Sequence, residues 1–167
     1  MADIVFIAGA PGVGKSTIAK KLHDVLKSPF FEFGWIPEFR VKGEADICYQ
    51  DEELLSFENL ILVVKNYIKH GFKNSIVTDL EDKRILELGE IFGDYEYQII
   101  TLTISSNDEM KARILDERRQ NDYRDIDSAI KINQSILERA LLKNEIRIDT
   151  TNKSASEVLD EVKSHLS

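Results

Sequence analysis

The chain has 167 residues, a length that suits one domain and allows a core of its own without disulfide or metal support. Hydrophobic residues make up 43% and charged residues 31% of the chain, which excludes a disordered or low-complexity protein. The formal net charge of −8 disfavours general binding to nucleic acids and to anionic membranes.

The single cysteine, Cys48, cannot form an internal disulfide, which is typical of a reducing compartment. The first residues lack the basic segment and the long apolar segment of a signal peptide. No stretch approaches the roughly 18 apolar residues of a membrane-spanning helix. We therefore expect a cytoplasmic protein with no membrane or nucleic-acid partner, acting as a monomer or a homodimer.

Short apolar runs alternate along the chain with segments of helical periodicity. The run at 4–8 predicts a strand buried on both faces, and a second strand is expected over 29–33. The helix between them has an expected buried face made of Ile18, Leu22, Val25 and Leu26. A longer helix is predicted over 52–70, with an apolar face made of Leu54, Leu55, Ile61, Val64 and Ile68.

The rest of the chain repeats this alternation. Strands are predicted over 75–79, 97–104 and 145–149, and helices over 85–92, 107–120, 126–143 and from 155 onward. Asn107 and Ser154 are expected to cap two of these helices. The alternation predicts a single α/β domain over 1–167, with a parallel sheet covered by helices on both faces.

The most specific motif consists of Gly9, Ala10, Pro11, Gly12, Val13, Gly14, Lys15, Ser16 and Thr17. It matches the pattern G-x-x-x-x-G-K-[ST] of a phosphate-binding loop, and it lies between a predicted strand and a predicted helix. Such a loop wraps backbone N–H groups around phosphate oxygens, helped by the positive end of the helix dipole. Lys15 would reach the β- and γ-phosphates, and the Ser16 hydroxyl would bind Mg²⁺. The motif therefore predicts a site for a nucleoside triphosphate.

With this motif and its setting, the chain resembles the P-loop NTPases of the small-kinase type, which include nucleoside monophosphate kinases, shikimate kinase and gluconate kinase. The resemblance implies a three-layer α/β/α fold with a five-stranded parallel sheet in the order 2-3-1-4-5. It also implies an arginine-bearing helical lid, here about 107–125, and an acceptor site formed by about 34–51. The implied reaction transfers the γ-phosphoryl group of ATP, with Mg²⁺, to a small acceptor.

The resemblance also implies roles for residues beyond the loop. Asp79, at the end of an apolar strand, matches a Walker B aspartate that holds Mg²⁺; a turn or capping residue is the alternative. Arg113 and Arg119 match lid arginines that stabilise the transferring phosphoryl group, with Arg118 and Arg124 as further candidates. The alternative for each arginine is a solvated charged helix with ion pairs at helical spacing.

The loop after the fifth strand is expected beside the nucleotide as well. In this family the corresponding loop packs against the adenine, so Asn152 is a candidate for binding the base. Arg113, besides its role in the lid, is a further candidate for binding ATP. Asn152 is also a good turn and capping residue, which gives it a purely structural alternative.

The acceptor is expected to bind over 34–51 and the strand end before it. Glu38 or Glu32 would orient the acceptor hydroxyl and take its proton. Arg40 and Lys42 would hold an anionic group of the acceptor, and Trp35 or Phe39 would stack on a ring or sugar. Segment 32–53 carries seven acidic residues against two basic ones, which favours a neutral or cationic acceptor such as a nucleoside, sugar, polyol or amino-sugar. The alternative for the glutamates is simple solvation.

Together these features predict an ATP- and Mg²⁺-dependent kinase acting on a small-molecule hydroxyl. The competing readings are a nucleotide-dependent switch without a small acceptor, and a nucleotide kinase or shikimate kinase. The acidic acceptor segment counts against a nucleotide kinase, because an acidic pocket repels a monophosphate.

Overall fold

The residues that the computed structural model describes, 2–39, 48–116 and 123–166, contain five parallel strands in the order β2-β3-β1-β4-β5. The strands are β1 (Ile4–Gly9), β2 (Phe30–Glu32), β3 (Ser75–Thr78), β4 (Tyr97–Thr103) and β5 (Glu145–Asp149). Strand β1 is central, and Ile4 lies opposite both Ser75 of β3 and Tyr97 of β4. The implied order 2-3-1-4-5 is therefore confirmed.

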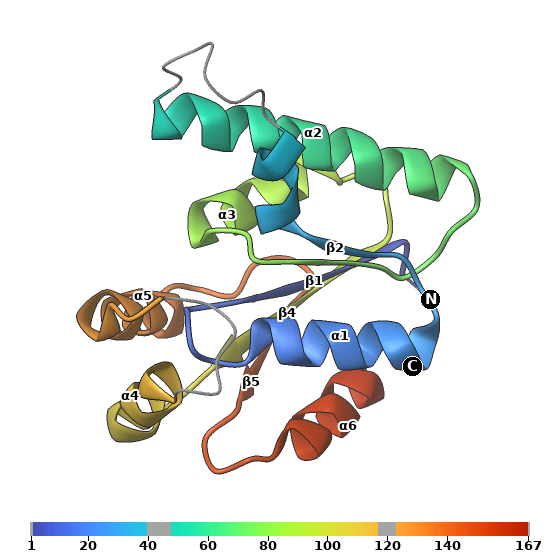
Figure 1. Cartoon of the computed structure of the whole chain (residues 1–167). Helices are drawn as coiled ribbons and strands as arrows, with labels where there is room; N and C mark the ends of the chain where they lie inside the picture. The colour runs from blue at the N-terminus through green and yellow to red at the C-terminus, as the bar shows by residue number, and fades with distance from the viewer. Residues whose placement is uncertain (1, 40–47, 117–122, 167) are drawn as a thin grey trace.

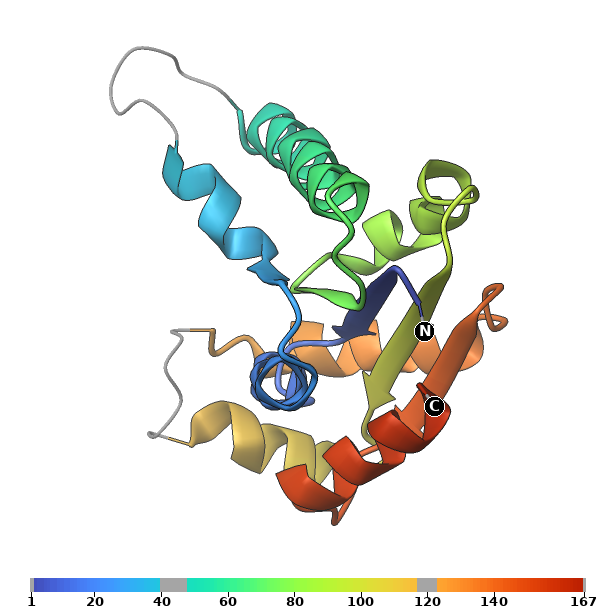
Figure 2. The ribbon, with the colours of Figure 1, turned by 90° about the vertical axis from the view of Figure 1, so that its right-hand side faces the viewer.

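Helices cover the sheet on both faces and complete three layers (Figures 1 and 2). The helices are α1 (Lys15–Leu26), η1 (Phe33–Phe39, a 3-10 helix), α2 (Tyr49–Lys69), α3 (Asp82–Ile91), α4 (Asn107–Leu115), α5 (Ile126–Glu138) and α6 (Ala155–His165). Helices α1 and α6 lie on one face, and α2 and α3 lie on the other. Helices α4 and α5 gather at the end of the sheet where β1 leads into α1.

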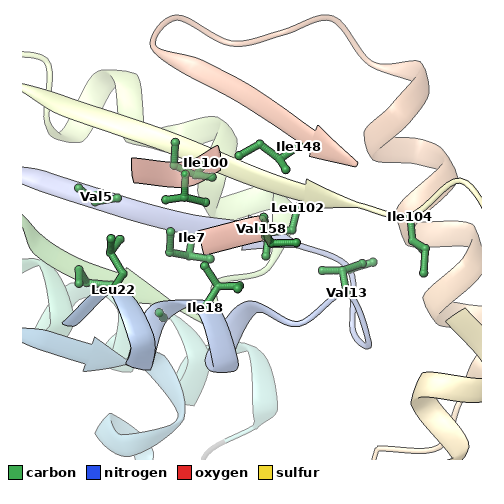
Figure 3. Packing of buried hydrophobic residues seen from close by; sticks show 14 of the residues in the cluster. Val5, Ile7, Val13, Ile18, Leu22, Ile100, Leu102, Ile104, Ile148 and Val158 are labelled. Atoms are coloured by element: carbon green, nitrogen blue, oxygen red, sulfur yellow. The ribbon is translucent and has the colours of Figure 1, made fainter. Parts of the chain in front are cut away.

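Two apolar clusters explain why β1 reads as a continuous hydrophobic run. Val5 and Ile7 point to one face, where they pack with residues of α1 and α6 such as Leu22 and Val158 (Figure 3). Their neighbours along the strand point to the opposite face, toward α2 and α3. Because successive strand residues alternate between faces, a strand covered on both sides must be apolar at every position.

The predicted inner face of α2 is partly wrong. Leu54 and Leu55 are 42% and 51% exposed, whereas Phe57 and Leu60 are buried against the sheet. The helix begins at Tyr49, and its orientation buries Glu53 instead of the leucines beside it. The face of α1 needs a similar correction, since Val25 is 51% exposed. In both helices, the predicted apolar face includes side chains that lie beside the face in contact with the sheet.

Several predicted boundaries also shift. Ser106, and not Asn107, caps α4, because its hydroxyl accepts a hydrogen bond from the Glu109 N–H. Helix α4 ends at Leu115, and the rest of the predicted helix, 117–120, lies outside the described residues. Helix α5 ends at Glu138 and not at 143. The cap at Ser154 is confirmed, and none of the described helices has the length and hydropathy to cross a membrane.

Candidate functional site

The phosphate-binding loop joins β1 to α1 at the carboxyl end of the sheet. Gly14 is the N-cap of α1 with φ of +102°, and no side chain caps the helix, so the N–H groups of its first turn remain for a ligand. Gly9 has φ of +131°, and a Cβ there would lie 2.3 Å from the Leu102 carbonyl oxygen of β4. Only glycine therefore lets β1 turn into the loop at this point.

Lys15 lies over the loop. Its Nζ atom donates a hydrogen bond of 3.2 Å to the carbonyl oxygen of Ala10. The ammonium group is also close enough to the Asp79 carboxyl group to act on its pKa, favouring the ionised form. The Lys15 ammonium group therefore lies between the phosphate-binding loop and the end of β3, where it could contact a bound γ-phosphate.

Oxygen ligands suited to Mg²⁺ meet beside the loop. The Ser16 hydroxyl donates a hydrogen bond of 3.2 Å to Glu32 Oε1, at the end of β2. Asp79, which follows β3, is near enough to Glu32 for the two carboxylates to repel each other. Hydroxyl and carboxylate oxygens are the ligands that Mg²⁺ prefers, so these residues fit the ion. Sequence reasoning had given Glu32 to the acceptor alone, whereas its position also suits the metal.

Asp79 has an unusual setting. Its φ is +70°, a left-handed conformation that places the residue outside β3, which ends at Thr78. The residue is exposed at the surface, yet the protein packed around its carboxyl group displaces water and so raises the pKa of Asp79. The positive charge of Lys15 lowers this pKa, and the negative charge of Glu32 raises it. A bound divalent cation would favour the ionised form of such a carboxyl group.

No group of three or more His, Cys, Asp or Glu side chains arranged around a metal is found in the part of the chain that the structure describes. The set at the loop provides two carboxylates, Glu32 and Asp79, together with the Ser16 hydroxyl. This composition suits an ion that completes its coordination with phosphate oxygens and water, the usual arrangement for Mg²⁺ at nucleotides.

A second group of polar side chains lies between α4 and the loop after β5. Arg113 Nη1 and Nη2 donate hydrogen bonds of 2.9 Å and 2.7 Å to Oγ1 and the carbonyl oxygen of Thr150. Arg113 also forms an ion pair with Glu109, whose carboxylate accepts a hydrogen bond from the Asn152 N–H. The structure thus brings together Arg113 and Asn152, which are both predicted to bind the nucleotide.

Helix α4 also packs directly on the phosphate-binding loop. A Cβ at Gly12, where φ is +91°, would lie 2.7 Å from Ile114 Cγ1. Met110 and Ile114 are fully buried in the cluster that contains Val13 of the loop. The helix that carries Arg113 is therefore fixed relative to the phosphate-binding groups.

The side of the molecule where the acceptor is expected is formed by η1, α2 and the start of α3. Trp35 is 43% exposed and meets the Phe30 ring edge to face, with ring centroids 5.2 Å apart, so it combines a packing contact with an accessible surface. Gly34 lies beside Asp79, because a Cβ at Gly34 would be 3.8 Å from Asp79 Oδ2. Glu38 belongs to η1. Arg40, Arg118 and Arg119 lie outside the described residues, and so does part of each predicted loop.

Two side chains at the expected acceptor side, Tyr49 and Glu81, were not predicted from the sequence as part of the site. Tyr49 Oη donates a hydrogen bond of 2.6 Å to Glu81 Oε1, which links the start of α2 to the segment after β3. This hydrogen bond to a carboxylate raises the pKa of the Tyr49 hydroxyl. Glu81 is the N-cap of α3 by position, but its side chain makes no capping hydrogen bond to that helix. A contact across 32 positions leaves no periodic signal in the sequence.

The basic residues of α3 at this side are paired with carboxylates. Arg84 binds both oxygens of the buried Glu53, at 2.9 Å and 2.7 Å, and it also binds Glu87. Lys83 forms ion pairs with Glu53 and Glu81. The hydrogen bonds from Arg84 lower the pKa of Glu53 against the opposing effect of burial, and those from Lys83 lower it further.

Comparisons with known proteins agree with this geometry. A family model described as NTPase matches residues 4–100, from the start of β1 into β4, while no curated protein matches the chain in sequence. Three similar solved structures each match 99% of the chain: a gluconokinase from Sinorhizobium meliloti 1021, the tunicamycin resistance protein of Deinococcus radiodurans, and a shikimate kinase from Acinetobacter baumannii. The gluconokinase has a TM-score of 0.69 and 15% identity, and 91% of its chain is matched. The tunicamycin resistance protein has a TM-score of 0.69 and 16% identity, and 96% of its chain is matched. The shikimate kinase has a TM-score of 0.60 and 12% identity, and 93% of its chain is matched. At such identities the likeness establishes the fold.

Proposed function

The chain belongs to the NTPase family, and on that premise we propose that it is a Mg²⁺-dependent kinase that transfers the γ-phosphoryl group of ATP to a hydroxyl of a small molecule. The observation that carries the proposal is the meeting of Lys15, Ser16, Glu32 and Asp79 at one end of the sheet. A phosphate cradle, a cation and a set of metal ligands are the parts that phosphoryl transfer requires.

Each described group has a role that follows from its position. The loop N–H groups and Lys15 hold the phosphates, while Ser16 and Asp79 hold the ion with help from Glu32. The Mg²⁺ ion, when bound, neutralises charge on the phosphate oxygens. Arg113 is held by the loop after β5, so we assign it to the nucleoside half of ATP. This assignment leaves stabilisation of the transferring group to the lid arginines, with Arg119 as the first candidate.

The acceptor that suits this chain best is a neutral or cationic hydroxyl compound, such as a nucleoside, sugar, polyol or amino-sugar. Glu32, Asp79 and Glu81 give the acceptor side a negative character, whereas Lys83 and Arg84 are neutralised by carboxylates. An anionic acceptor such as a monophosphate would need cations that are not already paired. Glu38, one turn into the acceptor segment, is our candidate for orienting the acceptor hydroxyl, with Trp35 as a stacking surface.

The proposal is tested by coupling ADP release to absorbance across nucleosides, sugars, polyols and aminoglycosides, with Mg²⁺ and ATP. We expect one class to stimulate ADP release well above the rate without acceptor, and we expect the phosphorylated acceptor as the product. Slow hydrolysis that no acceptor stimulates would contradict the kinase and favour a nucleotide-dependent switch. Stimulation by nucleoside monophosphates or shikimate would overturn the acceptor class and keep the reaction.

A further inference from the structure

Glu109 joins two elements that are far apart in the sequence. It lies in the first turn of α4, and its Oε1 accepts a hydrogen bond of 2.5 Å from Arg113 Nη2, one turn further along the helix. The same carboxylate accepts the backbone N–H of Asn152, at 3.0 Å to Oε2 and 3.3 Å to Oε1. An ordinary ion pair on a helix surface would contact no second element, so this one does more than stabilise α4.

The loop after β5 also holds the Arg113 guanidinium. The guanidinium donates to the carbonyl oxygen and to Oγ1 of Thr150, a residue only 1% exposed. The Thr150 hydroxyl in turn donates a hydrogen bond of 3.0 Å to the Thr103 carbonyl oxygen, at the end of β4. Hydrogen bonds to a guanidinium lie in its plane, so Glu109 and Thr150 together fix the orientation of that plane.

The position of this plane relative to the phosphate-binding loop is fixed too. Helix α4 packs through Met110 and Ile114 on the loop at Gly12 and Val13. Asn152 has φ of +56°, and its N–H points to the Glu109 carboxylate. While Glu109 keeps its contacts with Arg113 and with the Asn152 N–H, it therefore holds α4 and the loop after β5 in one arrangement relative to the phosphate-binding loop.

We propose that Glu109 is a positioning residue for the nucleoside half of the bound nucleotide. It holds Arg113 and the loop at Asn152 so that base and ribose bind in register with the phosphates, and it contacts no reacting atom. This inference rests on the proposed function only in requiring that the site binds a nucleoside triphosphate. It predicts that loss of Glu109 weakens the contribution of the nucleoside and leaves the contribution of the phosphates intact.

Calorimetric titration of the full chain with ATP and with inorganic tripolyphosphate, both with Mg²⁺, separates these contributions. Glu109→Ala should lower the affinity for ATP about tenfold, the effect of losing a charge-assisted hydrogen bond, and should leave the affinity for tripolyphosphate unchanged. Glu109→Gln keeps one acceptor oxygen and should fall between wild type and Glu109→Ala. Asp108→Ala is the matched control, since Asp108 is an exposed acid in the same helical turn, and it should change neither affinity.

The outcomes distinguish the two proposals. Equal losses for ATP and tripolyphosphate would overturn the positioning role, because they would mean that Glu109 supports the site as a whole. Unchanged ATP affinity in both Glu109 variants would overturn it as well. If Glu109→Ala fails to fold, the comparison of Glu109→Gln with wild type decides. If Glu109→Ala shows the selective loss of ATP affinity while the wild-type protein phosphorylates no acceptor, the kinase is refuted and the role of Glu109 stands.

Discussion

The Ser16 hydroxyl donates its hydrogen bond to the Glu32 carboxylate, and this contact joins the start of α1 to the end of β2. A hydroxyl that donates to a carboxylate keeps its lone pairs for a cation, and the carboxylate keeps an oxygen for the same ion. With Asp79 on the other side, the pair forms the part of the site that Mg²⁺ would occupy.

This contact predicts that Glu32→Gln lowers the affinity of the site for Mg²⁺ more than it lowers the affinity for the nucleotide. The amide cannot provide a charged ligand, so the Mg²⁺ concentration for half-maximal ATP turnover should rise about tenfold. The binding of ATP without metal should not weaken, because one negative charge beside the phosphates is removed. Titration of turnover with Mg²⁺ checks this, and Glu58→Gln, an exposed glutamate of α2, serves as the control. An unchanged Mg²⁺ requirement would remove Glu32 from the metal site.

Lys15 is expected to contribute to turnover without contributing to the stability of the fold. Lys15→Met keeps the length of the side chain and removes the charge that meets the phosphates, so ATP turnover should fall at least about a hundredfold. The melting temperature should stay near that of wild type, because the hydrogen bond from Lys15 to the Ala10 carbonyl oxygen lies within the phosphate-binding loop itself. Lys20→Met, at an exposed position of the same helix, should keep full turnover. Equal turnover in the two variants would refute the central assignment.

The parts of the fold that could be predicted from the sequence depend on short-range patterns. The phosphate-binding loop was predictable because its torsions, its glycines and its lysine all lie within nine consecutive positions. The buried strands were predictable because a strand covered on both faces is apolar throughout. The inner face of α2 was not predictable, since the buried Glu53 on it pairs with Arg84, 31 positions away, and with Lys83.

The same limit applies to the site. Glu109 gave no signal, because the backbone N–H that it binds is 43 positions away and any residue type carries such a group. Glu32 was assigned to the acceptor because its place at a strand end indicates a site without saying which ligand it faces. Asp79 was recognised through its strand, but its left-handed conformation was not predictable from its residue type.

Packing of α4 on the phosphate-binding loop predicts a specific cost for a methyl group at Gly12. Gly12→Ala combines a positive φ with a Cβ that would lie 2.7 Å from Ile114 Cγ1. Gly71→Ala is the matched control, since Gly71 also has positive φ but has nothing within 4 Å of the added Cβ. We expect a loss of about 1 kcal/mol of unfolding free energy at Gly71 and about 2–4 kcal/mol at Gly12. Urea denaturation checks the difference, and equal losses would contradict the close packing.

The last prediction concerns Glu145, whose side chain is fully buried at the start of β5. Arg139 donates to both of its oxygens, at 2.7 Å and 2.9 Å, and the Thr101 hydroxyl donates at 2.6 Å. Burial alone would raise the pKa of Glu145, but the bonds from Arg139 and Thr101 outweigh it and hold the pKa below its ordinary value of 4.5. The folded state therefore favours the ionised carboxylate more than the unfolded state does.

A lowered pKa in the folded state means that the stabilisation is present above the ordinary value and is lost as the pH falls through the lowered one. Glu145→Gln should therefore cost stability at pH 7, by about 2 kcal/mol, because Arg139 loses one ionic partner and keeps Asp82. The difference between wild type and variant should shrink as the pH falls below 4.5. Urea denaturation between pH 7 and about pH 3 measures it, with Glu90→Gln, an exposed glutamate of α3, as the control. A difference that stays constant over this range would show that the pair does not depend on the charge of Glu145.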